Sequence, residues 1–175
     1  MQHADWIAQY LERVSNACEE GRETVDYLRA RRTKIGIKPA RKSVGAFWTL
    51  AGNINLNSVH HSFESTLTNP RAWTVLIHET RHLKQGWLTA LSVYGELDAW
   101  QYEFSAYKKL IHAKLAPALE QLLELPLNWD RTNLMQARNL MQAYGGKGYR
   151  IDLLPLYPLH KEIKHWITRT WPASL

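Results

Sequence analysis

Apolar side chains recur every three or four residues along most of this sequence, which is the spacing of amphipathic helices. Between residues 4 and 32, Trp6, Tyr10 and Val14 follow that period, so one or two helices are expected there. The period returns in four later stretches, residues 69–86, 92–115, 130–146 and 149–171. The last stretch should start as an extended, proline-containing crossing before its helix. Helix therefore dominates the predicted fold.

Several helix boundaries are marked by their residues. Asn69-Pro70 offers an N-cap side chain followed by a ring that fits the first helical position, and Gly86 is a suitable stop. The next helix should begin near Ser92, and Pro117 should kink or restart it. Gly145 and Gly146 close the helix of residues 130–146.

The period changes between residues 34 and 59, where strands are expected. In "AGNINLNSV", Ile54 and Leu56 alternate with asparagines, which is typical of a half-exposed strand. Repeats and low-complexity linkers are absent from the sequence. We therefore expect one α+β domain over residues 1–175, with a small sheet before the helix of residues 69–86 and several helices packed against it.

Composition narrows the class of protein. With 175 residues and 45% hydrophobic side chains, the chain can build a substantial core. It has no run of about 18 apolar residues for a membrane span, and its opening "MQHADWIAQYLERV" carries charge where a signal peptide must be apolar. Cys18 is the lone cysteine and permits no internal disulfide. A soluble, cytoplasmic protein without a membrane partner is expected.

The charge pattern is a weaker clue. The net charge is +6, and seven Lys or Arg lie between Arg29 and Lys42, so some attraction for polyanions is expected. No helix-turn-helix, zinc knuckle or aromatic RNA-binding motif accompanies them. The stretch is better explained as a solvated helix end followed by an exposed strand, and a nucleic-acid partner is not expected.

The chemistry concentrates in His78-Glu79-Thr80-Arg81-His82, the motif HExxH, inside the helix expected at residues 69–86. Four residues apart on a helix, His78 and His82 project from one face, where two imidazoles can share a Zn²⁺. Zinc lowers the pKa of a coordinated water, and Glu79 can accept its proton and pass it to a leaving amine. The motif predicts a zinc site with Glu79 as general base.

A catalytic zinc needs a third protein ligand, and Glu96, Asp98 and Glu103 are the candidates on the following helix. If that helix starts near Ser92 and returns antiparallel, Glu96 reaches the level of the metal, while Glu103 lies about 10 Å further along. Asp98 points about 200° away from Glu96 at 100° per residue. Glu103 could instead hydrogen-bond a ligand histidine. A helix starting well before Thr89 would exchange the roles of the two glutamates.

HExxH followed by Glu96-Leu97-Asp98-Ala99 resembles the gluzincin metallopeptidases, and the short chain is most similar to minigluzincins and to the ImmA/IrrE-like compact zincins of bacteria and phages. The resemblance covers roughly residues 44 to 110. It implies a zincin-like fold, a Zn²⁺ cofactor, a peptide or protein substrate, and His78, His82 and Glu96 as metal ligands. It also implies that "AGNINLNSV" is an edge strand, where Asn53 and Asn55 would contact an extended substrate.

Peptide hydrolysis also needs a hydrogen-bond donor to the developing oxyanion. The sequence offers candidates without ranking them: Tyr94, Tyr102, Tyr149, Tyr157 and His160. His60 and His61 are expected as a loop pair, with substrate contact as the alternative. Two other functions remain open, a catalytically silent zincin-fold binding or regulatory protein and a basic nucleic-acid-binding module.

Overall fold

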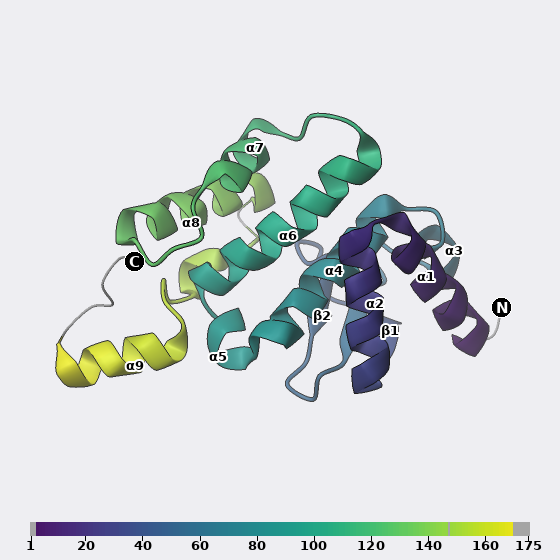
Figure 1. Cartoon of the computed structure of the whole chain (residues 1–175), viewed down its shortest axis with the longest axis horizontal. Coiled ribbons are helices and arrows are strands. Elements are labelled where there is room, and N and C mark those ends of the chain that lie inside the picture. The colour runs from purple at the N-terminus through teal and green to yellow at the C-terminus, as the bar shows by residue number, and fades with distance from the viewer. Residues whose placement is uncertain (1–2, 147, 170–175) are drawn as a thin grey trace. The chain divides into compact units, whose positions relative to one another are not determined.

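In the computed structural model, which describes residues 3–146 and 148–169, the chain is helix-dominated with one small mixed sheet, as predicted (Figure 1). The elements are α1 (His3–Ala17), α2 (Glu19–Arg31), β1 (Ile35–Lys38), β2 (Ala46–Trp48), β3 (Ile54–Asn57), α3 (Phe63–Thr66), α4 (Pro70–Gln85), α5 (Trp87–Ala90), α6 (Val93–Ile111), α7 (Pro117–Glu124), α8 (Arg131–Gly145), the 3₁₀ turn η1 (Ile151–Leu153) and α9 (Leu159–Thr168). The α+β fold class is therefore confirmed.

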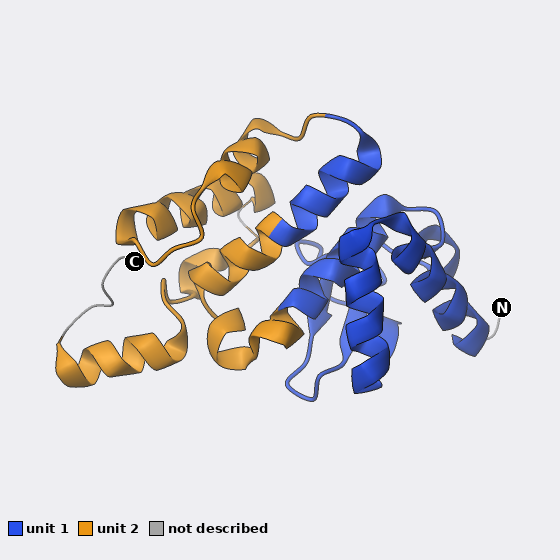
Figure 2. Cartoon of the chain, in the orientation of Figure 1, with its two compact units in different colours: residues 1–81, 102–113 blue, residues 82–101, 114–175 orange. Residues whose placement is uncertain are grey.

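The chain groups into two compact units (Figure 2). Unit 1 comprises residues 1–81 and 102–113, and unit 2 comprises residues 82–101 and 114–175. The division falls inside two continuous helices, after Arg81 in α4 and after Gln101 in α6. Organisation as a single domain stays a prediction.

In unit 1, α1 supplies the aromatic part of the core. Trp6, Tyr10 and Val14 are buried on one face, as their helical spacing predicted. The Trp6 indole donates a hydrogen bond to Thr66 Oγ1 at 2.8 Å, and the Tyr10 hydroxyl donates to the Ala72 carbonyl at 2.6 Å. Because a buried indole or phenol needs a partner, these bonds fix α1 against α3 and the start of α4.

The sheet corrects two predictions about the strand around Ile54. The strand order is β1-β3-β2, with β1 parallel and β2 antiparallel to β3. β3 is therefore the central strand and all four of its residues are buried, so it is neither an edge strand nor half-exposed. The alternating asparagines do not mark a solvated face, because Asn57 is buried and its amide is satisfied by hydrogen bonds. Its Oδ1 accepts from the Ala40 and Val59 N–H groups, and its Nδ2 donates to the Arg41 and Val44 carbonyls.

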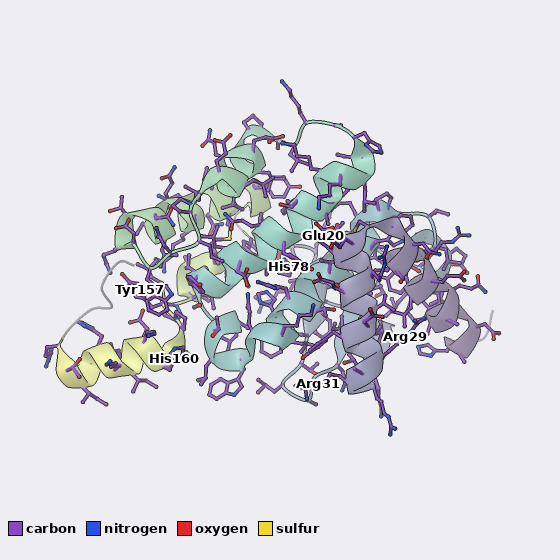
Figure 3. The ribbon with its side chains drawn as sticks, in the orientation of Figure 1. Glu20, Arg29, Arg31, His78, Tyr157 and His160 are labelled. Atoms are coloured by element: carbon purple, nitrogen blue, oxygen red, sulfur yellow. The ribbon has the colours of Figure 1, made fainter. Side chains whose placement is uncertain are left out.

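The basic stretch that ends α2 lies on the surface. Arg29 and Arg31 are exposed on α2 (Figure 3), Lys38 is exposed at the end of β1, and Arg41 and Lys42 are exposed beyond it. The other residues of β1 are less exposed, and Ile35 is buried. The predicted solvated helix end is thus confirmed, and the predicted exposed strand is confirmed only in part.

The two helices that carry the predicted site begin where the sequence indicated. Asn69 Oδ1 accepts a hydrogen bond from the Arg71 N–H at the start of α4, and Gly86, with φ +75°, follows its end. Ser92 Oγ accepts from the Gly95 N–H at the start of α6. α6 ends at Ile111, before the predicted Leu115, because His112 takes a left-handed conformation with φ +49°.

In unit 2, α7 and α8 form a helix pair whose buried residues include Leu119, Leu122, Leu134 and Met141. α8 is capped by Asp130, whose Oδ1 accepts from the Asn133 N–H at 2.8 Å. The helix predicted at residues 130–146 is therefore confirmed. Within residues 3–146 and 148–169, no helix has the length and apolar character to cross a membrane.

Candidate metal centre

The two histidines of the HExxH motif lie one turn apart on α4 and are both buried, at 9% exposure for His78 and 2% for His82. Residues 74–80 of this helix are all buried, and Leu76 and Ile77 beside the motif are fully so. Figure 3 shows His78 on this helix. The imidazoles are therefore part of the interior and not of a solvated helix face.

A glutamate from α6 completes a possible ligand set. One ligand atom each from His78, His82 and Glu96 lie within 4.8 Å of one another. His82 Nε2 lies 3.5 Å from Glu96 Oε1, so these two atoms face a common point. Glu96 sits in the first turn of α6, at the depth that the antiparallel return predicted, and the alternative ligand Glu103 lies outside this group.

Gln85 fixes the ring of His82. Its side-chain NH₂ donates to the Gly95 carbonyl at 2.9 Å and to Asp98 Oδ2 at 2.7 Å. Both of its N–H groups are thus used, and its Oε1, 3.1 Å from His82 Nδ1, can only accept. Nδ1 therefore donates to Gln85, and Nε2 is the nitrogen on the Glu96 side of the ring.

Glu103 occupies the equivalent position beside His78. Its Oε2 lies 3.0 Å from His78 Nδ1, and its Oε1 accepts a hydrogen bond from Arg71 Nη1 at 2.8 Å. The Arg71 guanidinium is itself held over the rings of Phe104 and Tyr107, at 4.9 and 5.0 Å from their centroids. Glu103 therefore lies where the sequence expected a partner for a ligand histidine, with its Oε2 on the Nδ1 side of the ring.

Glu96 is oriented by two aromatic donors. The Tyr149 hydroxyl donates to Glu96 Oε2 at 2.7 Å, and the Trp100 indole donates to the same oxygen at 3.2 Å and to the Tyr149 oxygen at 2.9 Å. The second oxygen of Glu96 is the one nearest His82. One carboxylate oxygen is thus anchored, and the other lies on the side of His82.

The donor set suits zinc. Two imidazole nitrogens and one carboxylate oxygen form a ligand set found in catalytic zinc sites, although other divalent metals accept it too. Hydrogen bonding to the outer atoms of the ligands is what fixes their orientation in metal sites. His82 and Glu96 have such anchors, and His78 has Glu103 beside its Nδ1, so the residues present fit a metal ion.

Glu79 follows His78 on α4 and is 7% exposed. The helix turns by about 100° per residue, so Glu79 leaves α4 beside the face that carries the two histidines. Its burial keeps it out of the solvated surface of the helix. This is consistent with the predicted general base, whose role stays a prediction.

Among the candidate oxyanion donors, Tyr149 forms a hydrogen bond with a predicted ligand, Glu96. Tyr102 donates instead to Glu23 Oε2 at 2.7 Å, and burial together with this bond raises the pKa of its phenol. Tyr94 packs edge-on against Trp129. Tyr157 is buried just before α9, and His160 is exposed in its first turn (Figure 3).

The remaining predicted contacts have different outcomes. Asn55 is buried in the central strand, and Asn53 precedes that strand in the turn after β2. The two asparagines therefore do not lie on an edge strand, on which their predicted contact with an extended substrate depended. His60 is exposed and His61 is buried after β3.

The sequence analysis did not identify Gln85 and Trp100 as residues of the candidate site. The spacing of Gln85, three residues after His82 on one helix, could have identified it.

Comparison of the chain with protein-family models, with curated proteins and with solved structures found no match. The metal centre therefore rests on its own geometry.

Proposed function

We propose that the chain is a zinc-dependent peptidase in which His78, His82 and Glu96 hold the metal. The observation that supports this most directly is the convergence of three ligand atoms within 4.8 Å from two different helices. The anchored outer atoms of His82 and Glu96 add to it, because an accidental cluster would not be expected to have its ligands oriented in this way.

When bound, zinc supplies Lewis acidity, which acidifies water and polarises a carbonyl group. His82 would hold the metal through Nε2, because its Nδ1 proton is committed to Gln85. Glu96 would add one negative charge to the ligand set. Glu79 takes a proton from the attacking water at its carboxylate and returns it to the leaving amine, which is general acid–base catalysis worth about 10²–10⁴-fold.

The substrate class is a peptide or protein in extended conformation. β3 cannot take up such a chain by strand addition, because β1 and β2 already occupy both of its sides. Pairing with this sheet would have to use the outer side of β1 or β2. This moves the proposed substrate contact away from Asn53 and Asn55.

The test separates metal binding from hydrolysis. Purified wild-type chain should contain about one zinc per molecule by elemental analysis and should cleave peptides in an unbiased fluorogenic library, with activity lost in chelator and restored by zinc. Glu79→Gln should retain the metal and lose hydrolysis by about 10²-fold or more. Glu96→Gln should lose both. Glu124→Gln, an exposed glutamate on α7, is the matched control and should lose neither.

Wild-type hydrolysis that survives in Glu79→Gln would remove the mechanism. A chain that takes up no transition metal would remove the site. Stoichiometric zinc without cleavage of any peptide would instead favour the catalytically silent binding protein.

A further inference from the structure

Helix α9 presents its apolar face outward. Ile163, Trp166 and Ile167 fall within an arc of about 100° on a helical projection. They are 56%, 77% and 77% exposed, and α9 as described, Leu159–Thr168, has no buried residue. An amphipathic helix of a folded protein normally buries this stripe, so its exposure requires an explanation.

The opposite face of α9, which meets the rest of unit 2, is polar. The Lys161 ammonium lies 4.0 Å from the centroid of the Trp129 ring, a cation–π contact. Glu162 Oε1 accepts a hydrogen bond from the Tyr157 N–H at 3.3 Å. These contacts hold α9 by its polar residues, so its orientation is the reverse of the usual one and is set by specific contacts.

The charges around the apolar stripe are mostly positive. Lys164 and Arg169 are exposed on or next to α9. The one acidic residue of the helix, Glu162, is engaged with the backbone of Tyr157. The chain as a whole carries a net charge of +6. An apolar stripe with a Trp, flanked by cations, is the pattern of helices that lie in a lipid–water interface.

We propose that α9 docks the protein onto an anionic lipid surface, with Ile163, Trp166 and Ile167 entering the acyl boundary and Lys164 and Arg169 meeting lipid phosphates. This surface is independent of the metal centre. It departs from the expectation of no membrane partner, which concerned spanning segments and not helices lying on a bilayer.

Two other occupants fit less well. A second copy of the chain would need roughly 800 Å² per partner for a standard interface, more than three side chains offer. A nucleic acid would be met by the cations but would leave the apolar stripe without a partner. Lipid satisfies both the stripe and its flanking charges.

The experiment is co-sedimentation of the full chain with sucrose-loaded vesicles, either pure phosphatidylcholine or phosphatidylcholine with about one third phosphatidylserine. Binding to the anionic vesicles should exceed binding to the neutral ones and weaken as salt rises. Trp166→Ser with Ile167→Ser should reduce the binding constant more than tenfold, because each buried large apolar side chain contributes a factor of that order. Lys164→Glu should reduce the preference for anionic lipid.

Leu153→Ser is the matched control, since Leu153 is equally exposed, at 67%, but lies in η1; it should bind like the wild type. All variants replace exposed residues, and circular dichroism melts check that they fold. The proposal is overturned if Trp166→Ser with Ile167→Ser binds vesicles like the wild type. It is also overturned if the wild type binds no vesicles and instead forms a dimer that these substitutions abolish. Binding of the wild type to a nucleic acid but not to vesicles would overturn it as well. Chelator should leave vesicle binding unchanged, whether or not the proposed peptidase function holds.

Discussion

Gln85 Oε1 lies 3.1 Å from His82 Nδ1, and the amide of Gln85 is held in this orientation by the Gly95 carbonyl and Asp98. The bond directs the Nδ1 proton of His82 toward Gln85. It also holds Nε2 on the side of Glu96, so Gln85 would be a positioning residue for the proposed metal.

Replacing Gln85 with Leu should therefore weaken zinc binding about 10–100-fold, the usual cost of losing a hydrogen-bonded partner of a ligand. Competition with a chromophoric chelator measures the affinity.

Gln101→Leu is the control for this experiment. Gln101 lies on the same helix as Glu96, and its NH₂ donates to the Leu122 and Leu125 carbonyls, so its loss should lower stability without changing the zinc affinity. Equal zinc affinity in Gln85→Leu and wild type would show that Gln85 does not orient the ligand.

Gly145 keeps space for the tyrosine that anchors Glu96. A Cβ at Gly145 would stand 2.7 Å from Tyr149 Cβ, closer than any real contact of this kind. Gly145→Ala should displace Tyr149, destabilise the fold by about 1–3 kcal/mol through overpacking, and weaken zinc binding. Tyr149→Phe, which removes only the hydroxyl that donates to Glu96, should weaken zinc binding as well. Chemical denaturation and chelator competition check the two effects.

A double-mutant cycle isolates the cause. In a Tyr149→Gly background the Cβ that Gly145→Ala would meet is absent, and Gly145→Ala should become neutral or stabilising by up to about 1 kcal/mol from helix propensity. Additive losses in the double variant would mean that the Gly145–Tyr149 contact is not responsible.

The parts of the site that could be predicted from the sequence are those determined locally. Asn69, Pro70 and Gly86 mark the ends of α4, and Ser92 marks the start of α6, so the depth of Glu96 on the returning helix followed from residue spacing. The contacts of Glu96 with Tyr149 span 53 positions in the chain. No helical period encodes a contact of that range, which is why Tyr149 could only be named among several candidates.

The prediction that the strand around Ile54 is half-exposed and at the edge of the sheet was wrong for a related reason. Alternation of Ile54 and Leu56 with asparagines correctly predicted a strand, but the period of a strand does not reveal whether its polar face is solvated or buried with hydrogen-bond partners. The partners of Asn57 lie 13 to 17 residues earlier and two residues later. Parallel pairing with β1, also non-local, made β3 central.

His61 should make stability depend on pH. Burial lowers the pKa of its imidazole below the ordinary value, and the positive charges of His60 and Arg71 add to this. The unfolded chain then binds the proton more readily than the folded one, so stability is full above the unfolded pKa, about 6.5, and falls as the pH drops below it. Urea unfolding at pH 7.5 and pH 5.5 should show a smaller difference in His61→Gln than in the wild type.

The wild type and His61→Gln both contain His78 and His82, so any contribution of these two histidines cancels when the two pH differences in stability are compared. His160→Gln, an exposed histidine on α9, should keep the wild-type difference. An unchanged pH difference in His61→Gln would exclude His61 as the source.

Asn57 should be among the most sensitive polar positions of the sheet. It is fully buried and its amide makes four hydrogen bonds to backbone groups of the surrounding loops, at 2.7 to 3.1 Å. Asn57→Ala removes all four of these part-buried bonds, so at about 1 kcal/mol each it should cost up to about 4 kcal/mol of unfolding free energy. Urea denaturation followed by circular dichroism measures it.

Asn53, just before β3, provides the matched control. It joins the turn through its backbone, with its N–H donating to Thr49 Oγ1 and its carbonyl accepting from the Thr49 N–H, and alanine preserves both bonds. Asn53→Ala should therefore change stability by no more than about 0.5 kcal/mol. If the two alanine variants lost equal stability, the cost at Asn57 could not come from its amide, and hydrogen bonding would not explain how the central strand tolerates a buried polar residue.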